Sequence, residues 1–134
     1  MRSSNTSEPS RQIVAQRIRN RIIDYFELAS SFDKQLEYEH AAPIHVPHEI
    51  INQWEDWNPE SIANVGEPVF ESHESEAIAA FSRIWNQVAE ATPNPLPPLR
   101  ELQQSSQWNV LRGAAEVALL VFLKRGRFPE EVEI

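Results

Sequence analysis

The spacing of apolar residues near the start of the chain is the feature that most constrains its fold. Between positions 14 and 36 they recur every three or four residues, without an intervening proline or glycine. That is the period of one face of an α-helix. The spacing predicts one helix from about Ser10 to Glu39, ~45 Å long at 1.5 Å per residue. We favour this single helix over the alternative, two helices that break at Ser30-Ser31.

Two tryptophans lie three positions apart in an acidic stretch, NQWEDWNPES at positions 52–61. Pro47 can begin a short helix here, because proline fits a first helical turn, and the spacing puts both indoles on one face with Ile50. We favour docking of this face on the core. The alternative is an exposed interaction surface, since tryptophan is over-represented among interface hot spots. Its residues would be Trp54, Trp57, Glu55 and Asp56.

The second half of the chain predicts two more long helices. Ser72 can cap the first, whose apolar stripe runs from Ala77 to Val88. The segment 110–123 is apolar nearly all round, so we expect it to form the buried centre of the fold. Its buried residues would include Leu119, Leu120, Phe122 and Leu123. Between the two helices, TPNPLPPL holds four prolines, which we interpret as a stiff spacer rather than as a ligand for an SH3-like module.

These patterns together predict an all-α fold. The chain shows no internal repeat and no alternation with period two of the kind that predicts a sheet. Its 134 residues are close to the commonest size of a single domain. We therefore expect a single-domain helical bundle of four or five helices over residues 10–134. It would have a long N-terminal helix, a buried C-terminal helix and a flexible tail at residues 1–9.

The net charge of −8 is concentrated in one segment. Residues 1–26 carry five arginines and two acids, which sum to +3; residues 27–76 carry twelve acids and one lysine, which sum to −11. Residues 77–134 balance six against six. A segment of −11 repels the phosphates of nucleic acid and favours basic partners or cations. The alternative is a solvated acidic face that keeps the protein in solution.

Missing residue types exclude several kinds of chemistry. The chain has no cysteine, which removes disulfides, thiolate metal sites and cysteine nucleophiles. Its three glycines make neither a phosphate-binding loop nor the G-x-S-x-G motif of serine hydrolases. There is no apolar run of the kind found in secretory signals or bilayer-spanning helices. We expect a cytoplasmic protein that does not contact membranes.

All four histidines lie in the acidic middle of the chain. Glu37-x-x-His40 places a carboxylate and an imidazole one helical turn apart, a spacing that di-iron carboxylate bundles use twice. A zinc site would need three or four such ligands within ~2.0 to 2.2 Å of one point. The candidate ligands for a divalent metal are Glu37, His40, His45, His48, Glu49 and His73. We weigh this site against solvated or hydrogen-bonded histidines, which we favour, and expect no cofactor.

Arginines at 11, 17, 19 and 21 form a basic cluster. On a helical wheel Arg19 points away from Arg17 and Arg21, and no ladder of aromatic residues accompanies them, so we do not expect nucleic-acid binding. These arginines are better suited to pair with the acidic segment, in the same chain or in a second copy. The charge distribution favours a non-enzymatic protein-interaction module, a regulator, adaptor or inhibitor of a basic partner. A metal-binding protein or small metal-dependent enzyme using residues 37–76 is the alternative.

The first helix also predicts a homodimer. A ~45 Å helix exceeds the ~30 Å span expected of a domain of this size, and Ile13 and Ile23 fall outside its main apolar stripe. A two-fold contact would cover them and bring the arginine-rich start of one helix to the acidic middle of the other copy. Ile23 is therefore a candidate interface residue. The alternative is a helix that breaks near Ser30-Ser31 and covers these residues within one chain.

Overall fold

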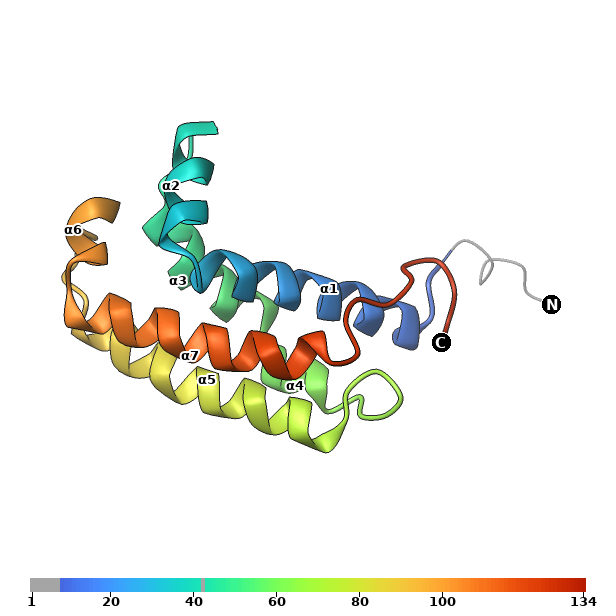
Figure 1. Cartoon of the computed structure of the whole chain (residues 1–134). Helices are drawn as coiled ribbons and strands as arrows, with labels where there is room; N and C mark the ends of the chain where they lie inside the picture. The colour runs from blue at the N-terminus through green and yellow to red at the C-terminus, as the bar shows by residue number, and fades with distance from the viewer. Residues whose placement is uncertain (1–7, 42) are drawn as a thin grey trace.

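The computed structural model describes residues 8–41 and 43–134, and these residues form seven helices and no strand (Figure 1). The helices are α1 (Arg11–Ala29), α2 (Phe32–Ala41), α3 (Val46–Trp57), α4 (Pro59–Ala63), α5 (Ser72–Ala91), α6 (Leu99–Gln103) and α7 (Ser106–Leu123). The predicted all-α class is confirmed, with more helices than the four or five expected. Of the predicted flexible tail, residues 1–7 lie outside the described residues.

The expectation of one helix from Ser10 to Glu39 is wrong, and the chain breaks at Ser30-Ser31. From that point α2 leaves the line of α1 at a steep angle (Figure 1). The hydroxyl of Ser31 accepts a hydrogen bond from the Lys34 N–H at 3.1 Å and so caps α2. Gln35 then folds back, and its Nε2 donates to the carbonyls of Leu28 and Ala29 at 3.1 and 3.2 Å. Side chains therefore satisfy the backbone groups that a continuous helix would have paired.

The core lies between α1, α5 and α7, which run side by side (Figure 1). From α3, Trp54 reaches this core: its ring centre is 4.6 Å from that of Phe81, and its Nε1 donates to Ser82 Oγ at 2.9 Å. Tyr25 and Phe26 of α1 complete an aromatic cluster around it. Trp54 thus docks α3 on the bundle, which is the interpretation favoured from the sequence.

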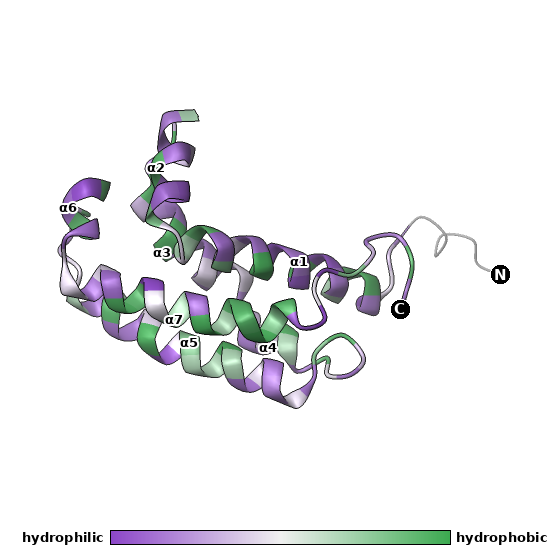
Figure 2. Cartoon of the chain, in the orientation of Figure 1, coloured by the Kyte–Doolittle hydropathy of each residue, from purple (hydrophilic) through white to green (hydrophobic). Residues whose placement is uncertain are grey.

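The C-terminal helix is less buried than its composition predicted. Of the four residues expected inside, only Phe122 is buried; Leu119 is half-buried, and Leu120 and Leu123 are exposed. The reason is that α7 packs against α5 and α1 on one side only, with Ala115 and Ala118 among its buried residues. Figure 2 shows α7 as a mostly apolar ribbon at the front of the bundle. None of the described helices has the length and apolar character needed to cross a bilayer.

After α7 the chain turns back along α1. Gly126 makes the turn with φ of +75°, a conformation that favours glycine, and its N–H donates to the Phe122 carbonyl at 2.8 Å. The segment 127–134 then lies beside the first half of α1 (Figure 1). Gln16 Nε2 donates to the carbonyls of Pro129 and Val132 at 2.7 and 2.9 Å. The C-terminus is thereby held close to the start of α1.

Candidate functional site

An open groove of about 600 Å³ lies between α1, α2 and α3. It exists because the break at Ser30-Ser31 directs α2 away from α1 and leaves a corner that α3 borders. The lining residues are Arg21, Asp24, Tyr25, Leu28, Lys34, Glu37, Tyr38, Ala41, Gln53 and Trp57. A concave site with an aromatic floor and a few charged groups at its rim is the usual form of a binding site.

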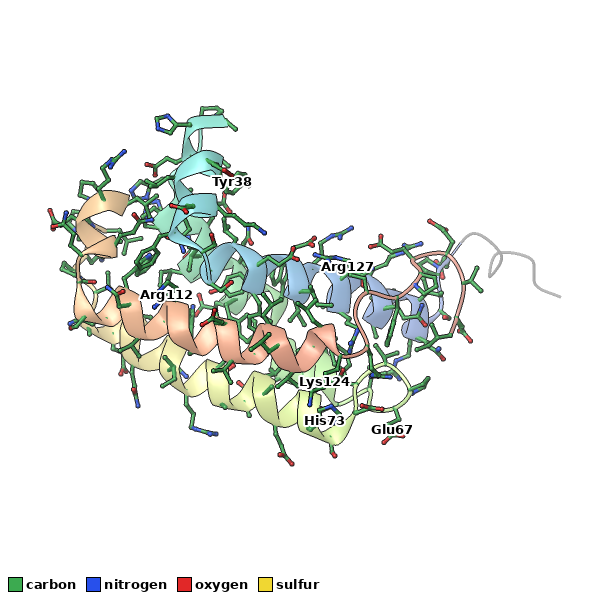
Figure 3. The ribbon with its side chains drawn as sticks, viewed as in Figure 1. Tyr38, Glu67, His73, Arg112, Lys124 and Arg127 are labelled. Carbon is green, nitrogen blue, oxygen red and sulfur yellow. The ribbon has the colours of Figure 1, made fainter. Side chains whose placement is uncertain are left out.

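Aromatic side chains give the groove its apolar surface. Trp57 is half-buried, and its ring meets that of Tyr25 edge to face with centres 5.8 Å apart. Tyr25 is fixed from below, since its hydroxyl donates to the Ile50 carbonyl at 2.7 Å and burial raises its pKa well above 10. Tyr38 stands exposed on α2 at the other side (Figure 3). The groove therefore offers a preformed apolar contact with one rigid wall.

Some of the charged side chains around the groove already form ion pairs, and others do not. Asp24 accepts hydrogen bonds from Arg127, in the C-terminal segment labelled in Figure 3, and from Arg21. Arg127 also donates to Glu27 at 2.7 Å. Glu37 is exposed on α2, and among the described residues no ion pair holds it. Glu37 is thus the carboxylate at the rim that is available to a ligand.

The acidic segment also reaches beyond the rim. Five of its carboxylates are exposed on α2, α3 and α4, and Lys34 is the one lysine or arginine between residues 27 and 76. They are Asp33, Glu37, Glu55, Asp56 and Glu60. The outer surfaces of these three helices are therefore negatively charged at neutral pH.

The structure separates the residues of the predicted interaction surface. Trp54 is buried in the core, whereas Trp57 lines the groove, and Glu55 and Asp56 are exposed on α3 but are not among the residues that line the groove. Ile23 has no exposed surface, so its assignment to a dimer interface is wrong. It is covered within the chain, because α1 packs against α7, α3 and α4 at once. Ile13 and Ile23 are thus both buried within one chain, which is the outcome that the alternative described.

The predicted metal ligands do not form one cluster among the residues that the structure describes. The rings of His45 and His48 meet edge to face with centres 4.5 Å apart, and Glu37 and His40 line a hollow on α2. His73 lies elsewhere, with its Nε2 3.4 Å from Glu71 Oε1. The one group of potential ligands that converges within 4.8 Å in the described ranges is Glu71, His73 and Glu74.

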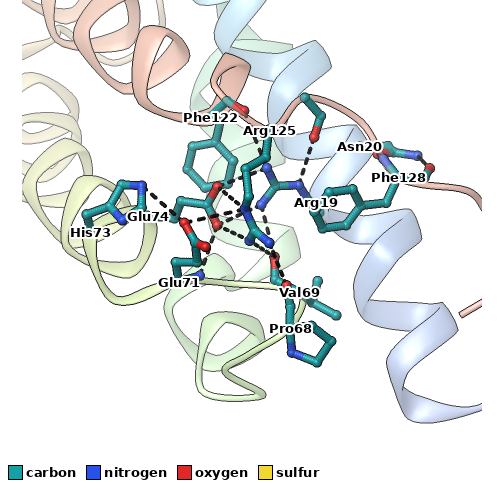
Figure 4. A network of polar contacts seen from close by, with 11 residues as sticks. Arg19, Asn20, Pro68, Val69, Glu71, His73, Glu74, Phe122, Arg125 and Phe128 are labelled. Carbon is teal, nitrogen blue, oxygen red and sulfur yellow. Dashed lines mark hydrogen bonds and ion pairs between the residues drawn. The ribbon is translucent and has the colours of Figure 1, made fainter. Parts of the chain in front are cut away.

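Glu74, the most buried member of that group, is already bound by two arginines (Figure 4). Arg19 donates to both carboxylate oxygens of Glu74 at 2.9 and 3.0 Å, and Arg125 Nη2 donates to Oε1 at 2.6 Å. Burial raises the pKa of Glu74, but the bonds from Arg125, Arg19 and the Glu71 N–H outweigh burial and lower the pKa to about 2. A metal ion would have to displace two arginines, so we interpret the group as structural.

Glu74 also corrects the predicted cap of α5. The helix begins at Ser72, and its N-cap is Glu71, whose N–H donates to Glu74 Oε1 at 2.9 Å. Arg19, as the sequence suggested, pairs with the acidic segment of its own chain. What the sequence did not indicate is that both partners are fully buried.

Of the sites described, the groove alone combines an open apolar surface with an available charge, and the Glu74 network already has its own partners. The functional inference therefore rests on the groove. Comparison with known proteins adds no family to it, since no family model, no curated protein and no solved structure matches this chain.

Proposed function

We propose that this chain is a non-enzymatic interaction module whose groove receives an apolar side chain of a basic partner protein. The observation that carries the proposal is the half-buried Trp57 on the floor of an open groove. The charged residues that line the groove balance, with Arg21 and Lys34 against Asp24 and Glu37, while the exposed surfaces of α2 to α4 around it carry an excess of carboxylates. A large aromatic ring that is fixed in place contributes contact area at little entropic cost, which is why tryptophan recurs at interface hot spots.

Charge selects the partner. The exposed carboxylates of α2 to α4 repel acidic chains and attract lysine and arginine over about a Debye length, ~8 Å at physiological salt. Glu37 places one of these carboxylates at the rim, within reach of a ligand whose apolar side chain enters the groove. A regulator, adaptor or inhibitor of a basic protein would bind in this way, with the groove supplying affinity and the acids supplying selectivity and association rate.

Short synthetic peptides test the proposal directly. The probe peptide has a central leucine or phenylalanine between lysine and arginine residues; one control replaces the basic residues by glutamate, and the other replaces the apolar residue by alanine. Binding is followed by amide chemical shifts in two-dimensional NMR. We expect the basic peptide to shift groove residues of α1, α2 and α3, to bind more weakly as salt is raised, and to need its apolar residue.

Two pairs of variants locate the contact. Trp57→Ala should weaken the peptide about tenfold or more, and Val65→Ala, at an exposed position outside the groove, should leave it unchanged. Glu37→Lys should weaken it more than Glu90→Lys, the same charge reversal at an exposed position of α5. Equal effects of the two reversals, or binding that survives Trp57→Ala, would remove the groove as the binding site.

A further inference from the structure

The outer face of α7 exposes four large apolar side chains to solvent. Val110, Val117, Leu120 and Leu123 are all exposed, with Val117 at 66% and Leu120 at 62%. Their spacing of seven, three and three residues places them on one side of the helix, which we call the α7 face. Single exposed apolar residues are ordinary, but contiguous patches mark surfaces of interaction. In Figure 1 no other element crosses the front of α7.

We infer that the α7 face is the surface through which two copies of this chain associate, as an antiparallel helix pair. The protein carries a net charge of −8, so two copies repel each other over most of their surface. The −11 segment lies on α2 to α4 and the start of α5, whereas α7 holds only Arg112 and Glu116, which sum to zero. The repulsion between copies is therefore smallest where the apolar surface is largest.

Charge also fixes how the two helices meet. Glu116, Leu120 and Lys124 follow one another at intervals of four and form a row along the α7 face. A two-fold axis at Leu120 reverses this row, and so sets Glu116 opposite the partner's Lys124 and Lys124 opposite the partner's Glu116. Leu120 then packs on the partner's Leu120, and Val117 lies level with the partner's Leu123.

The exposed charges of the α7 face favour the two-fold axis at Leu120. Glu116 and Lys124 are both exposed, and among the described residues neither takes part in an ion pair. An axis at Val117 would instead bring the two Glu116 side chains to within ~3 Å of each other along the helix direction, because each is one residue from the axis. The axis at Leu120 separates them by ~12 Å. Like-charge repulsion therefore favours the second arrangement.

The proposed contact is small. One helix face buries less than the ~1,200 to 2,000 Å² of a standard interface, so we expect a reversible dimer with a dissociation constant in the micromolar range. This contact is independent of the groove, because the α7 face and the groove share no residue. Peptide binding and self-association therefore stand or fall separately.

Sedimentation equilibrium, from low to several hundred micromolar protein, measures the association. The variant is Val117→Glu, and its matched control is Val132→Glu, the same change at a valine of 65% exposure in the C-terminal segment. Both positions are exposed, and circular dichroism checks that both variants keep their helices. We expect Val117→Glu to raise the dimer dissociation constant about tenfold or more, and Val132→Glu to leave it unchanged.

Charge exchange tests the arrangement. Glu116→Lys and Lys124→Glu should each weaken the dimer by ~3 to 10-fold, because each sets like charges opposite one another twice. The double variant restores opposite charges and should recover the wild-type constant. A wild-type protein that stays monomeric throughout, a dimer unaffected by Val117→Glu, or single and double charge variants that behave alike would overturn the inference. Monomeric protein that binds neutral phosphatidylcholine vesicles through Val117 would overturn it too, and assign the face to lipid.

Discussion

The guanidinium of Arg19 is enclosed by aromatic rings and hydrogen-bond acceptors in the interior of the protein. Its Cζ lies 4.2 Å from the ring centre of Phe128 and 4.9 Å from that of Phe122. Its nitrogens donate to Glu74 and to the carbonyls of Val69 and Gly126. A buried charge needs such complete pairing, because desolvation costs several kcal/mol per ion. The residue therefore ties together segments that lie far apart in the sequence.

Replacing Glu74 by glutamine should destabilise the protein by ~3 to 5 kcal/mol, because Arg19 would remain buried without its counter-charge. Urea unfolding measures the loss. Glu76→Gln, two positions away and exposed, is the matched control and should change stability by less than ~0.5 kcal/mol. Similar losses in the two variants would show that the buried ion pair has no special role.

The same pair predicts how stability depends on pH. The pKa of Glu74 is lowered from 4.5 to about 2 in the folded protein, so its carboxylate stabilises the fold fully above about pH 4.5. That contribution declines as the pH falls from 4.5 towards 2, where the folded protein takes up the proton. The stability difference between wild type and Glu74→Gln should therefore narrow over this window, and a constant difference from pH 7 to pH 2 would contradict the assignment.

The corner between α1 and α2 is held by Gln35. This buried side chain donates to the end of α1 and accepts from Trp108 Nε1 of α7 at 3.1 Å and from Gln103 Nε2 of α6 at 3.2 Å. Four helices thus meet at one amide. Since the corner also opens the groove, the position of Gln35 links the packing of the bundle to its candidate binding site.

Gln35→Leu should cost ~2 to 4 kcal/mol, because a side chain of similar size leaves Trp108 Nε1 and the Ala29 carbonyl without the partner that Gln35 provides. Thermal or urea unfolding measures the loss. Gln104→Leu, at an exposed position beyond α6, serves as control and should be close to neutral. The outcome against this role would be a Gln35→Leu protein as stable as the control.

The sequence predicted the helices well and their relations poorly, for physical reasons. Period and capping residues are local, so the all-α class and helical segments near those of α3, α5 and α7 followed from them. The break at Ser30-Ser31 did not, because the apolar spacing continues through it, and because Gln35, which stabilises it, is itself bonded to Trp108 and Gln103, residues that only folding brings near it. The groove was not predicted either, because it forms at the same break. Trp57 was identified from its type and spacing, whereas Tyr25, Leu28 and Tyr38 became its neighbours only through the corner.

The exposed side of α7 leads to a prediction for Leu120 that is opposite to the burial expected from the composition of the helix. Leu120→Ala should cost less than ~1 kcal/mol, since its side chain is mostly in solvent, whereas Phe122→Ala should cost ~3 to 5 kcal/mol. Unfolding is measured at low micromolar protein, where self-association contributes little. A large loss for Leu120→Ala would mean that α7 is buried on both sides, as its apolar composition first indicated.

The C-terminal segment, residues 127–134, packs along α1 and completes the fold. It lies along α1 through bonds from Gln16, Arg17 and Asn20, the last donating to the Phe128 carbonyl at 2.9 Å. Phe128 covers Arg19 and Arg125, the two arginines that hold Glu74. Arg127 pairs with Asp24 and Glu27 at the edge of the groove. The C-terminal segment is therefore coupled to the buried network and to the candidate site.

Removal of residues 128–134 should accordingly destabilise the protein by ~3 kcal/mol or more. The deletion removes the Phe128 ring, and a desolvated cation–π contact alone contributes ~2 kcal/mol, while each lost hydrogen bond adds ~0.5 to 1.5 kcal/mol. It also admits water to Arg19, which weakens its pairing with Glu74. Phe128→Ala should account for much of the loss, and Val132→Ala, at an exposed position of the same segment, should have little effect. Urea unfolding of the three variants separates these contributions. A truncated protein as stable as the full chain would mean that the segment rests on α1 without stabilising it.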